Sequence, residues 1–184
     1  MYRRGNKMLL REFKPTWMIN SVYSIAPQQL KQQGIRAVFT DLDNTLIAWN
    51  NPDGTPELKK WMQELDDNNI PLIVISNNNY ARVKRAVAPL SLPFISRALK
   101  PLGVGINRAV KKLGLQPHEV VMVGDQLLTD MIAANQAGVY SILVRPLIST
   151  DAWNTRINRF FEQYVMRQLL KQYPALKWQE ELND

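Results

Sequence analysis

Several acidic side chains in this sequence come directly after segments of apolar residues. In proteins with a parallel sheet, functional residues lie at such positions, just after the strands. Asp41 and Asp43 come directly after one apolar run, and Asp125 and Asp130 come after another. In an open parallel sheet, ligands bind at the edge formed by the carboxyl ends of the strands. Four carboxylates gathered at one edge would repel one another without a cation, and an all-oxygen ligand set favours Mg²⁺ over Zn²⁺. The spacing therefore predicts a magnesium site at this edge.

Two hydroxyls, an amide and a lysine are predicted to join the acids. Thr45 lies in the loop that carries the first acids, and Ser76 and Asn77 follow the apolar run 71–75. Lys100 lies between this group and the last acidic pair. We expect all of these side chains at the same rim of the sheet.

These groups resemble, in type and in order, the motifs of the haloacid dehalogenase (HAD) phosphatases. The string D-L-D-N-T-L at 41–46 matches D-x-D-x-T, and the string at 124–130 matches G-D-x-x-x-x-D. Ser76 and Lys100 supply the hydroxyl and the lysine that lie between them in that family. The chain looks like the YqeG-type subfamily (subfamily IIIA) in particular, by its motifs D-L-D-N-T-L, I-S-N-N and V-G-D-Q-L-L-T-D. That subfamily is similar to mitochondrial phosphatidylglycerophosphatases. The resemblance spans about residues 35–145.

The resemblance implies a Mg²⁺-dependent phosphomonoester hydrolase that forms an aspartyl-phosphate. By it, Asp41 is the nucleophile, and Asp43 protonates the leaving oxygen and later deprotonates the attacking water. Lys100 is the third catalytic residue. Magnesium would be bound by Asp41, the backbone carbonyl of Asp43 and Asp125, while Asp130 supports the site by orienting Lys100 or a metal-bound water.

The same resemblance assigns residues to the substrate. The phosphoryl group would be bound by Thr45, Ser76, Asn77 and Lys100, with Thr45 also steadying its loop. Phosphoryl transfer needs an in-line nucleophile, neutralised equatorial oxygens and a protonated leaving group, and these residue types can supply all three.

Strands and helices alternate along the chain. Continuous apolar strands indicate burial on both faces, which is typical of a parallel sheet between helices. We therefore expect an α/β, three-layer, HAD-like (Rossmann-like) fold in one domain, 1–184, with a basic N-terminal extension (about 1–20) and an amphipathic C-terminal helix (about 153–173). Strands are predicted at 35–40, 71–75, 94–95, 120–123 and 140–144, and helices at 57–67, 80–88, 105–113 and 127–137.

The composition limits the possible functions. The chain has 184 residues, a net charge of +7 and no cysteine, which excludes thiolate catalysis, disulfides and cysteine-bound zinc. No acidic residue lies between Asp67 and Glu119, where eight lysines and arginines do. Such a basic stretch favours anionic partners, or is simply a solvated surface.

Short gaps between the motifs leave no room for a folded cap domain after Thr45 or after Ser76, so a capless, open site is expected. The leading substrate is phosphatidylglycerophosphate; the alternatives are a soluble phosphomonoester or phosphoprotein, or an RNA- or ribosome-binding module on the same fold. No base-stacking aromatic motif is present, so no nucleic-acid partner is expected. The tail helix would either lie at an anionic membrane or pack on the domain. We expect a cytoplasmic protein, with possible peripheral contact with a membrane; the sequence does not determine the oligomeric state.

Overall fold

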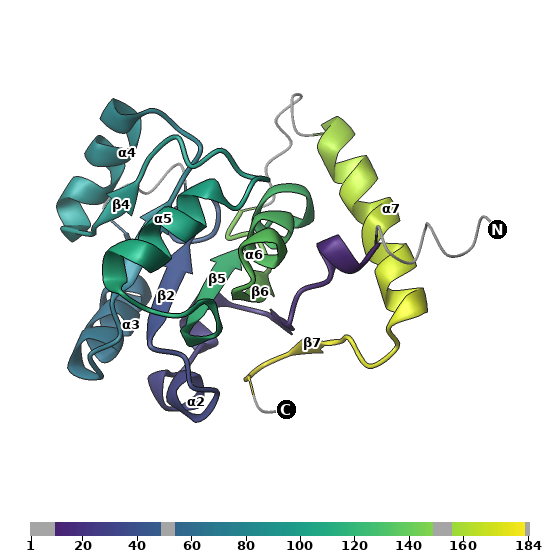
Figure 1. Ribbon diagram of the computed structural model, residues 1–184, viewed down its shortest axis with the longest axis horizontal. Helices are drawn as coiled ribbons and strands as arrows, with labels where there is room; N and C mark the ends of the chain where they lie inside the picture. The colour runs from purple at the N-terminus through teal and green to yellow at the C-terminus, as the bar shows by residue number, and fades with distance from the viewer. Residues whose placement is uncertain (1–9, 49–53, 149–155, 183–184) are drawn as a thin grey trace.

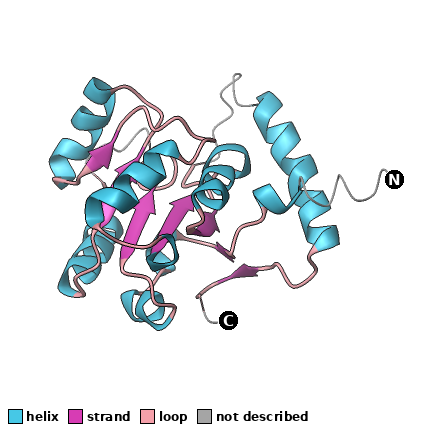
Figure 2. Ribbon diagram, viewed as in Figure 1, coloured by secondary structure: helices cyan, strands magenta, loops and turns pink. Residues whose placement is uncertain are grey.

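The computed structural model describes residues 10–48, 54–148 and 156–182, with the backbone alone described for 156–160. They form a seven-stranded sheet with helices on both faces (Figures 1 and 2). All neighbouring strands are parallel, in the order β4-β3-β2-β5-β6-β1-β7. This confirms the predicted α/β class. The strands are β1 (Trp17–Ile19), β2 (Ala37–Thr40), β3 (Leu72–Ile75), β4 (Phe94–Ile95), β5 (Val120–Gly124), β6 (Tyr140–Val144) and β7 (Trp178–Gln179).

The helices connect these strands, as parallel pairing requires. The α-helices are α2 (Pro27–Gln32), α3 (Pro56–Asp67), α4 (Tyr80–Val87), α5 (Val104–Leu113), α6 (Ile132–Ala137) and α7 (Arg156–Gln172). Short 3-10 helices are η1 (Val22–Ser24), η2 (Ala88–Leu90) and η3 (Pro117–Glu119), and η4 (Leu127–Met131) is a π-helix.

Alternate residues of the central strands face two separate cores. Val38 of β2 packs in a cluster with Trp61 of α3 and Val83 of α4. Its neighbour Phe39 packs on the other face with Ile106 of α5. Because successive side chains of a strand point to opposite faces, a strand buried between two helical layers must be apolar at every position. This explains why the central strands are continuous apolar runs.

Most predicted elements are present, and the differences lie at the margins of the sheet. The helix predicted over 127–137 is divided into η4 and α6. Strands β1 and β7 and helix α2 were not predicted, and β1 lies within the segment interpreted as an N-terminal extension. Residues 1–9 of that segment, and 153–155 of the predicted tail helix, lie outside the described residues.

Helix α7 packs on the edge of the domain by one side (Figure 1). Leu169 is fully buried in a third cluster with Met18 of β1 and Met131 of η4. Away from this contact, Tyr164 is 58% exposed and Leu170 is 38% exposed. The inner face of the tail helix therefore packs on the domain, which is one of the two alternatives left open by the sequence. Among the described residues, none of the helices is long and apolar enough to cross a bilayer.

The register of the sheet aligns the ends of the strands that precede the motifs. Thr40 at the end of β2 pairs with Val74 of β3 on one side and Val123 of β5 on the other. The backbone N–H of Asp41 donates to the carbonyl of Val123 at 2.9 Å. The residues that follow these three strands therefore start from the same rim. In the described residues between Thr45 and Lys100, the chain forms only α3, β3, α4, η2 and β4, with no additional domain over the rim.

Candidate active site

Three acids and a lysine from three separate segments meet at this rim. Asp41, Asp125 and Asp130 each place a carboxylate oxygen within 4.8 Å of the other two. The Nζ of Lys100 donates to Asp41 Oδ1 at 2.5 Å and to Asp130 Oδ1 at 2.7 Å. Because Lys100 is almost fully buried, these two carboxylates replace water as the hydrogen-bond partners of its ammonium group. The structure thus joins residues as far apart in sequence as Asp41 and Asp130.

The cluster holds more negative charge than the lysine neutralises. Burial raises the pKa of Asp125 to about 8, and the nearby charges of Asp130 and Asp41 add to this. Burial also raises the pKa of Asp41 to about 6, against the opposing effect of Lys100. Burial lowers the pKa of Lys100, but Asp130 and Asp41 outweigh it and leave that pKa above its usual value. The lysine is thus held as a cation while the carboxylates still repel one another.

Gly124 gives Asp130 its place in the cluster. A Cβ built on Gly124 would overlap the carboxyl group of Asp130, so only glycine fits there. The backbone N–H of Gln126 donates to the other oxygen, Asp130 Oδ2, at 3.2 Å. Both oxygens of this buried carboxylate therefore have partners, and the Gly-Asp spacing of the motif has a steric cause.

The loop after β2 turns sharply and is joined to Asp125. Asn44 adopts a left-handed conformation with φ of 64°, which asparagine tolerates better than most residues. This turn leaves Thr45 fully buried, and its hydroxyl donates to Asp125 Oδ1 at 2.8 Å. Thr45, predicted to bind substrate, contacts the candidate metal ligand Asp125 here.

Asn77 holds the backbone of Lys100. Its Nδ2 donates to the Lys100 carbonyl at 2.7 Å, and its Oδ1 accepts from the Lys100 backbone N–H at 2.7 Å. The amide was predicted to bind phosphoryl oxygens, but in the structure both of its polar atoms position the lysine. A direct contact between Asn77 and substrate stays a prediction.

Asp43 faces away from the acid cluster, toward α4. Its Oδ1 accepts from Arg82 Nη2 at 2.8 Å, and its Oδ2 accepts from Asn78 Nδ2 at 2.8 Å. Asn78 also contacts the buried hydroxyl oxygen of Ser76, through its backbone N–H at 3.2 Å and its Nδ2 at 3.3 Å. The predicted contribution of Asp43 to the metal is its backbone carbonyl, and this too stays a prediction.

Arg82 and Asn78 were not among the predicted site residues. The run I-S-N-N-N could have suggested Asn78, because it follows Ser76 at the end of a strand. Arg82 was counted only as one of many basic residues. Asn79 caps α4 by accepting from the Arg82 backbone N–H at 3.0 Å, and this sets the first turn of the helix beside Asp43.

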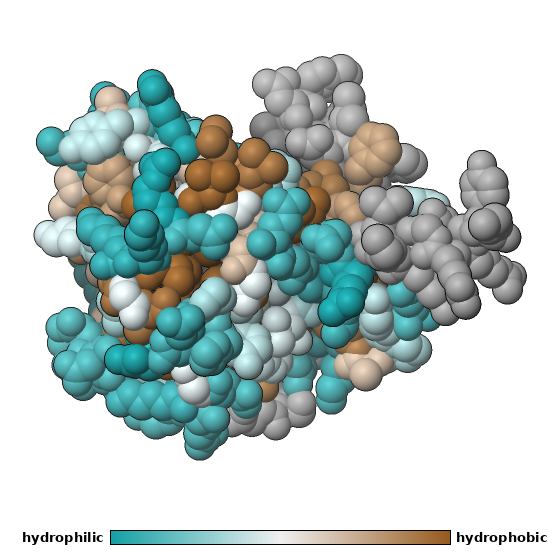
Figure 3. Space-filling model, in the orientation of Figure 1, coloured by the Kyte–Doolittle hydropathy of each residue, from teal (hydrophilic) through white to brown (hydrophobic). Residues whose placement is uncertain are grey.

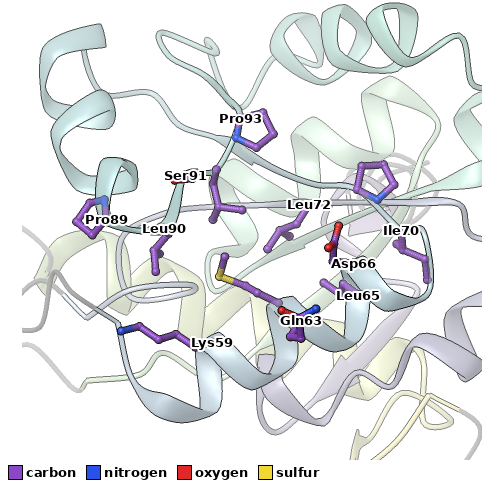
Figure 4. A pocket seen from close by; sticks show the side chains of 13 residues that line it. Lys59, Gln63, Leu65, Asp66, Ile70, Leu72, Pro89, Leu90, Ser91 and Pro93 are labelled. Carbon is purple, nitrogen blue, oxygen red and sulfur yellow. The ribbon is translucent and has the colours of Figure 1, made fainter.

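Two hollows bear on the extent of the site. One, of about 360 Å³, opens beside Asp43; its lining includes Leu42, Ile47, Arg82 and Arg85. A larger one, of about 520 Å³, lies between α3 and the segment 89–93 (Figure 4). It reaches Leu72 at the start of β3, whereas Ser76 follows the end of that strand. It therefore lies at the opposite end of the sheet from the acids.

The donor set fits a hard divalent cation. Asp41 and Asp125 supply carboxylate oxygens, the ligands that Mg²⁺ prefers. Two positive charges would offset the repulsion that raises the pKa of Asp125. The described residues offer no cysteine or histidine to this cluster, which argues against a zinc site.

Comparison with known proteins agrees with this geometry. Residues 2–138 match the family model of haloacid dehalogenase-like hydrolases. The chain is 40% identical over 173 residues to "Probable phosphatase YqeG" of Bacillus subtilis, covering 94% of this chain and 100% of that one.

More distant likeness extends to two eukaryotic proteins. The chain is 26% identical to the Arabidopsis thaliana "Phosphatidylglycerophosphate phosphatase 1, chloroplastic/mitochondrial", covering 80% of this chain and 42% of that one. It is also 26% identical to the Saccharomyces cerevisiae "Phosphatidylglycerophosphatase GEP4, mitochondrial", covering 64% of this chain and 71% of that one.

Proposed function

The chain belongs to the haloacid dehalogenase-like hydrolase family, and from this we propose a phosphatase that works through a phosphorylated Asp41 and acts on phosphatidylglycerophosphate. The observation that carries the mechanism is the ammonium of Lys100 between Asp41 and Asp130, with Asp125 alongside. No other group of three or more metal-binding side chains occurs in the described parts of the chain.

In the first step an oxygen of Asp41 attacks phosphorus and forms the aspartyl-phosphate, while the bond from phosphorus to the ester oxygen breaks. Asp43 gives its proton to that oxygen, and the alcohol departs. In the second step Asp43 takes a proton from water, whose oxygen attacks phosphorus and releases phosphate from Asp41. Arg82 and Asn78 hold the side chain of Asp43 in place, apart from the acid cluster.

Lys100 and the cation share the task of neutralising charge. Mg²⁺ would be held by Asp41, Asp125 and the backbone carbonyl of Asp43, and would neutralise charge on the phosphoryl oxygens. The Lys100 ammonium keeps Asp41 oriented and can contact an equatorial oxygen of the phosphoryl group. Asn77 keeps Lys100 at this position through its two backbone hydrogen bonds.

Two observations favour phosphatidylglycerophosphate over other phosphomonoesters. The two eukaryotic relatives carry this substrate in their names. Independently, the hollow beside Asp43 combines apolar Leu42 and Ile47 with Arg82 and Arg85. The departing alcohol must lie beside Asp43, and in this lipid that alcohol carries a phosphodiester anion and acyl chains. Arginine suits such an anion, so the two arginines of the hollow match the phosphodiester of the leaving group.

The test is hydrolysis, with Mg²⁺, of a panel containing phosphatidylglycerophosphate, soluble phosphomonoesters and a phosphopeptide. Asp41→Asn should remove essentially all turnover, whereas Asp66→Asn, on the exposed side of α3, should leave it unchanged. Residual activity of Asp41→Asn close to wild type would refute the mechanism. Turnover of the lipid no faster than of soluble esters would refute the substrate alone.

A further inference from the structure

We propose that three exposed apolar side chains beside the active site, Leu99, Leu102 and Val104, dock on the surface of an anionic lipid bilayer. We call these three residues the rim patch. Their exposed fractions are 56%, 52% and 43%, which is unusual for large apolar residues so close together. Figure 3 shows hydrophobic residues gathered on the surface near the start of α5. Contiguous exposed apolar surface of this kind marks an interaction site.

The backbone holds the rim patch outward. The Asn77 side chain hydrogen-bonds to both the backbone N–H and the carbonyl of Lys100, and the Ala98 N–H donates to the Ser76 carbonyl at 3.0 Å. The Gly105 N–H donates to the Ala98 carbonyl at 3.1 Å, and a side chain on Gly105 would collide with Ala98. The loop therefore cannot easily turn its leucines inward, and their apolar surface stays in water until a partner covers it.

The rim patch is fixed next to the catalytic residues by the chain itself. Leu99 directly precedes Lys100, so their Cα atoms are about 3.8 Å apart, and Leu102 follows two residues later. The Lys100 side chain runs inward to Asp41, while the Leu99 side chain is exposed to solvent. Any surface that covers the rim patch therefore lies at the mouth of the active site.

Charge around the rim patch indicates what covers it. The stretch 68–118, which contains it, has no acidic residue. Arg97 is exposed two residues before Leu99, and Arg108 and Lys111 follow Val104 at one-turn intervals on the exposed side of α5. Aliphatic side chains bordered by cations match the interface of an anionic bilayer. Aliphatic residues do not stack on bases, which makes a nucleic acid the poorer match.

This inference concerns where the protein meets lipid, and binding itself does not depend on catalysis. Its consequence rests on the proposed function: a bilayer on the rim patch would present a lipid phosphate directly to Asp41. It also differs from the tail-helix interpretation, because it assigns the contact to the loop before α5 and not to α7.

The experiment is flotation of the full chain with vesicles of phosphatidylcholine alone, or of phosphatidylcholine mixed with phosphatidylglycerol. Wild type should float with the mixed vesicles and much less with phosphatidylcholine alone. Leu99→Ser with Leu102→Ser should weaken partition to the mixed vesicles about tenfold or more. The matched control, Tyr164→Ser with Leu170→Ser on the exposed side of α7, should float like wild type.

Thermal melting shows whether each variant is folded, and Leu102→Asn alone provides a milder second test with the same expected direction. The inference is overturned if the rim variants float like wild type, or if the α7 control loses binding in their place. It is also overturned if the rim substitutions leave flotation unchanged and abolish only self-association, measured by light scattering, or only the retention of an RNA oligonucleotide. Asp41→Asn should float normally, so failure of the proposed function and failure of this inference give different results.

Discussion

Replacing Asp125 by asparagine should stabilise the metal-free protein while abolishing its activity. Burial, with the charges of Asp130 and Asp41, raises the pKa of Asp125 to about 8, so its ionised form is unfavourable in the folded chain. Asparagine keeps the shape of the side chain and an oxygen that can accept from Thr45, but it carries no charge. The substitution therefore removes repulsion without leaving the threonine hydroxyl unpaired.

The size of the effect follows from the difference between the folded and unfolded pKa values of Asp125. Its ordinary pKa is 3.8, so in the unfolded chain the carboxyl ionises from about pH 4 upward. The stability that Asp125 contributes is therefore fully present below that pH and is lost as the pH rises toward about 8. Three pH units between 4 and 7 correspond to roughly 4 kcal/mol, and relaxation around the charge reduces this. We expect Asp125→Asn to gain about 2–4 kcal/mol at pH 7, or roughly 4–16 °C in Tm.

The assay is thermal melting of wild type and Asp125→Asn in EDTA, at several values between pH 5 and pH 8. The difference in Tm should be small at pH 5 and grow as the pH rises. Mg²⁺ should raise the Tm of wild type more than that of the variant, because binding to the folded state alone adds stability. An equal or lower Tm for Asp125→Asn in EDTA at the upper end of this range would refute the reasoning.

Two further substitutions test how the catalytic side chains are positioned. Gly124→Ala should lower the free energy of unfolding by about 1–3 kcal/mol and nearly abolish turnover, because the new methyl group displaces Asp130. Chemical denaturation measures the first effect and an activity assay the second. A fully active, equally stable variant would contradict the steric argument. Arg82→Gln should lower kcat about tenfold on an alkyl phosphate, since Asp43 loses the donor that positions it. The loss should be smaller on p-nitrophenyl phosphate, whose leaving group needs little protonation. Lys84→Gln on the same helix is the matched control, and equal losses on both esters would rule out a role through Asp43.

The central half of the fold follows from the sequence because its strands are buried by local helices. Strands β2, β3 and β5 are continuous apolar runs, each followed by a helix with apolar residues at helical spacing. Their polar residues at the carboxyl ends then predict which side chains share a rim. Asp41, Ser76 and Asp125 could thus be assigned to one site without knowledge of the tertiary structure.

The edge of the sheet could not be predicted in the same way. Strand β1 has three residues and β7 has two, too short for any periodic pattern. They are strands because β1 pairs with β6 and β7 pairs with β1, contacts between segments more than a hundred residues apart. Likewise, the ion pair between Asp43 and Arg82 depends on how α4 is set against the loop after β2. Spacing along the chain contains no signal for such a contact.

The loop between β4 and α5 departs from local rules in three ways at once. Arg97 and Leu99 have positive φ, a conformation that costs large side chains energy, and the lysine between the exposed leucines is buried. Each departure is offset by tertiary contacts: Asn77 holds the backbone, and Asp41 and Asp130 receive the ammonium. Residues that violate local preferences in this way tend to occupy functional sites. In this segment the Lys100 side chain points to the nucleophile and the Leu99 side chain points to solvent. Selection for both catalysis and surface recognition in the same loop best explains this arrangement.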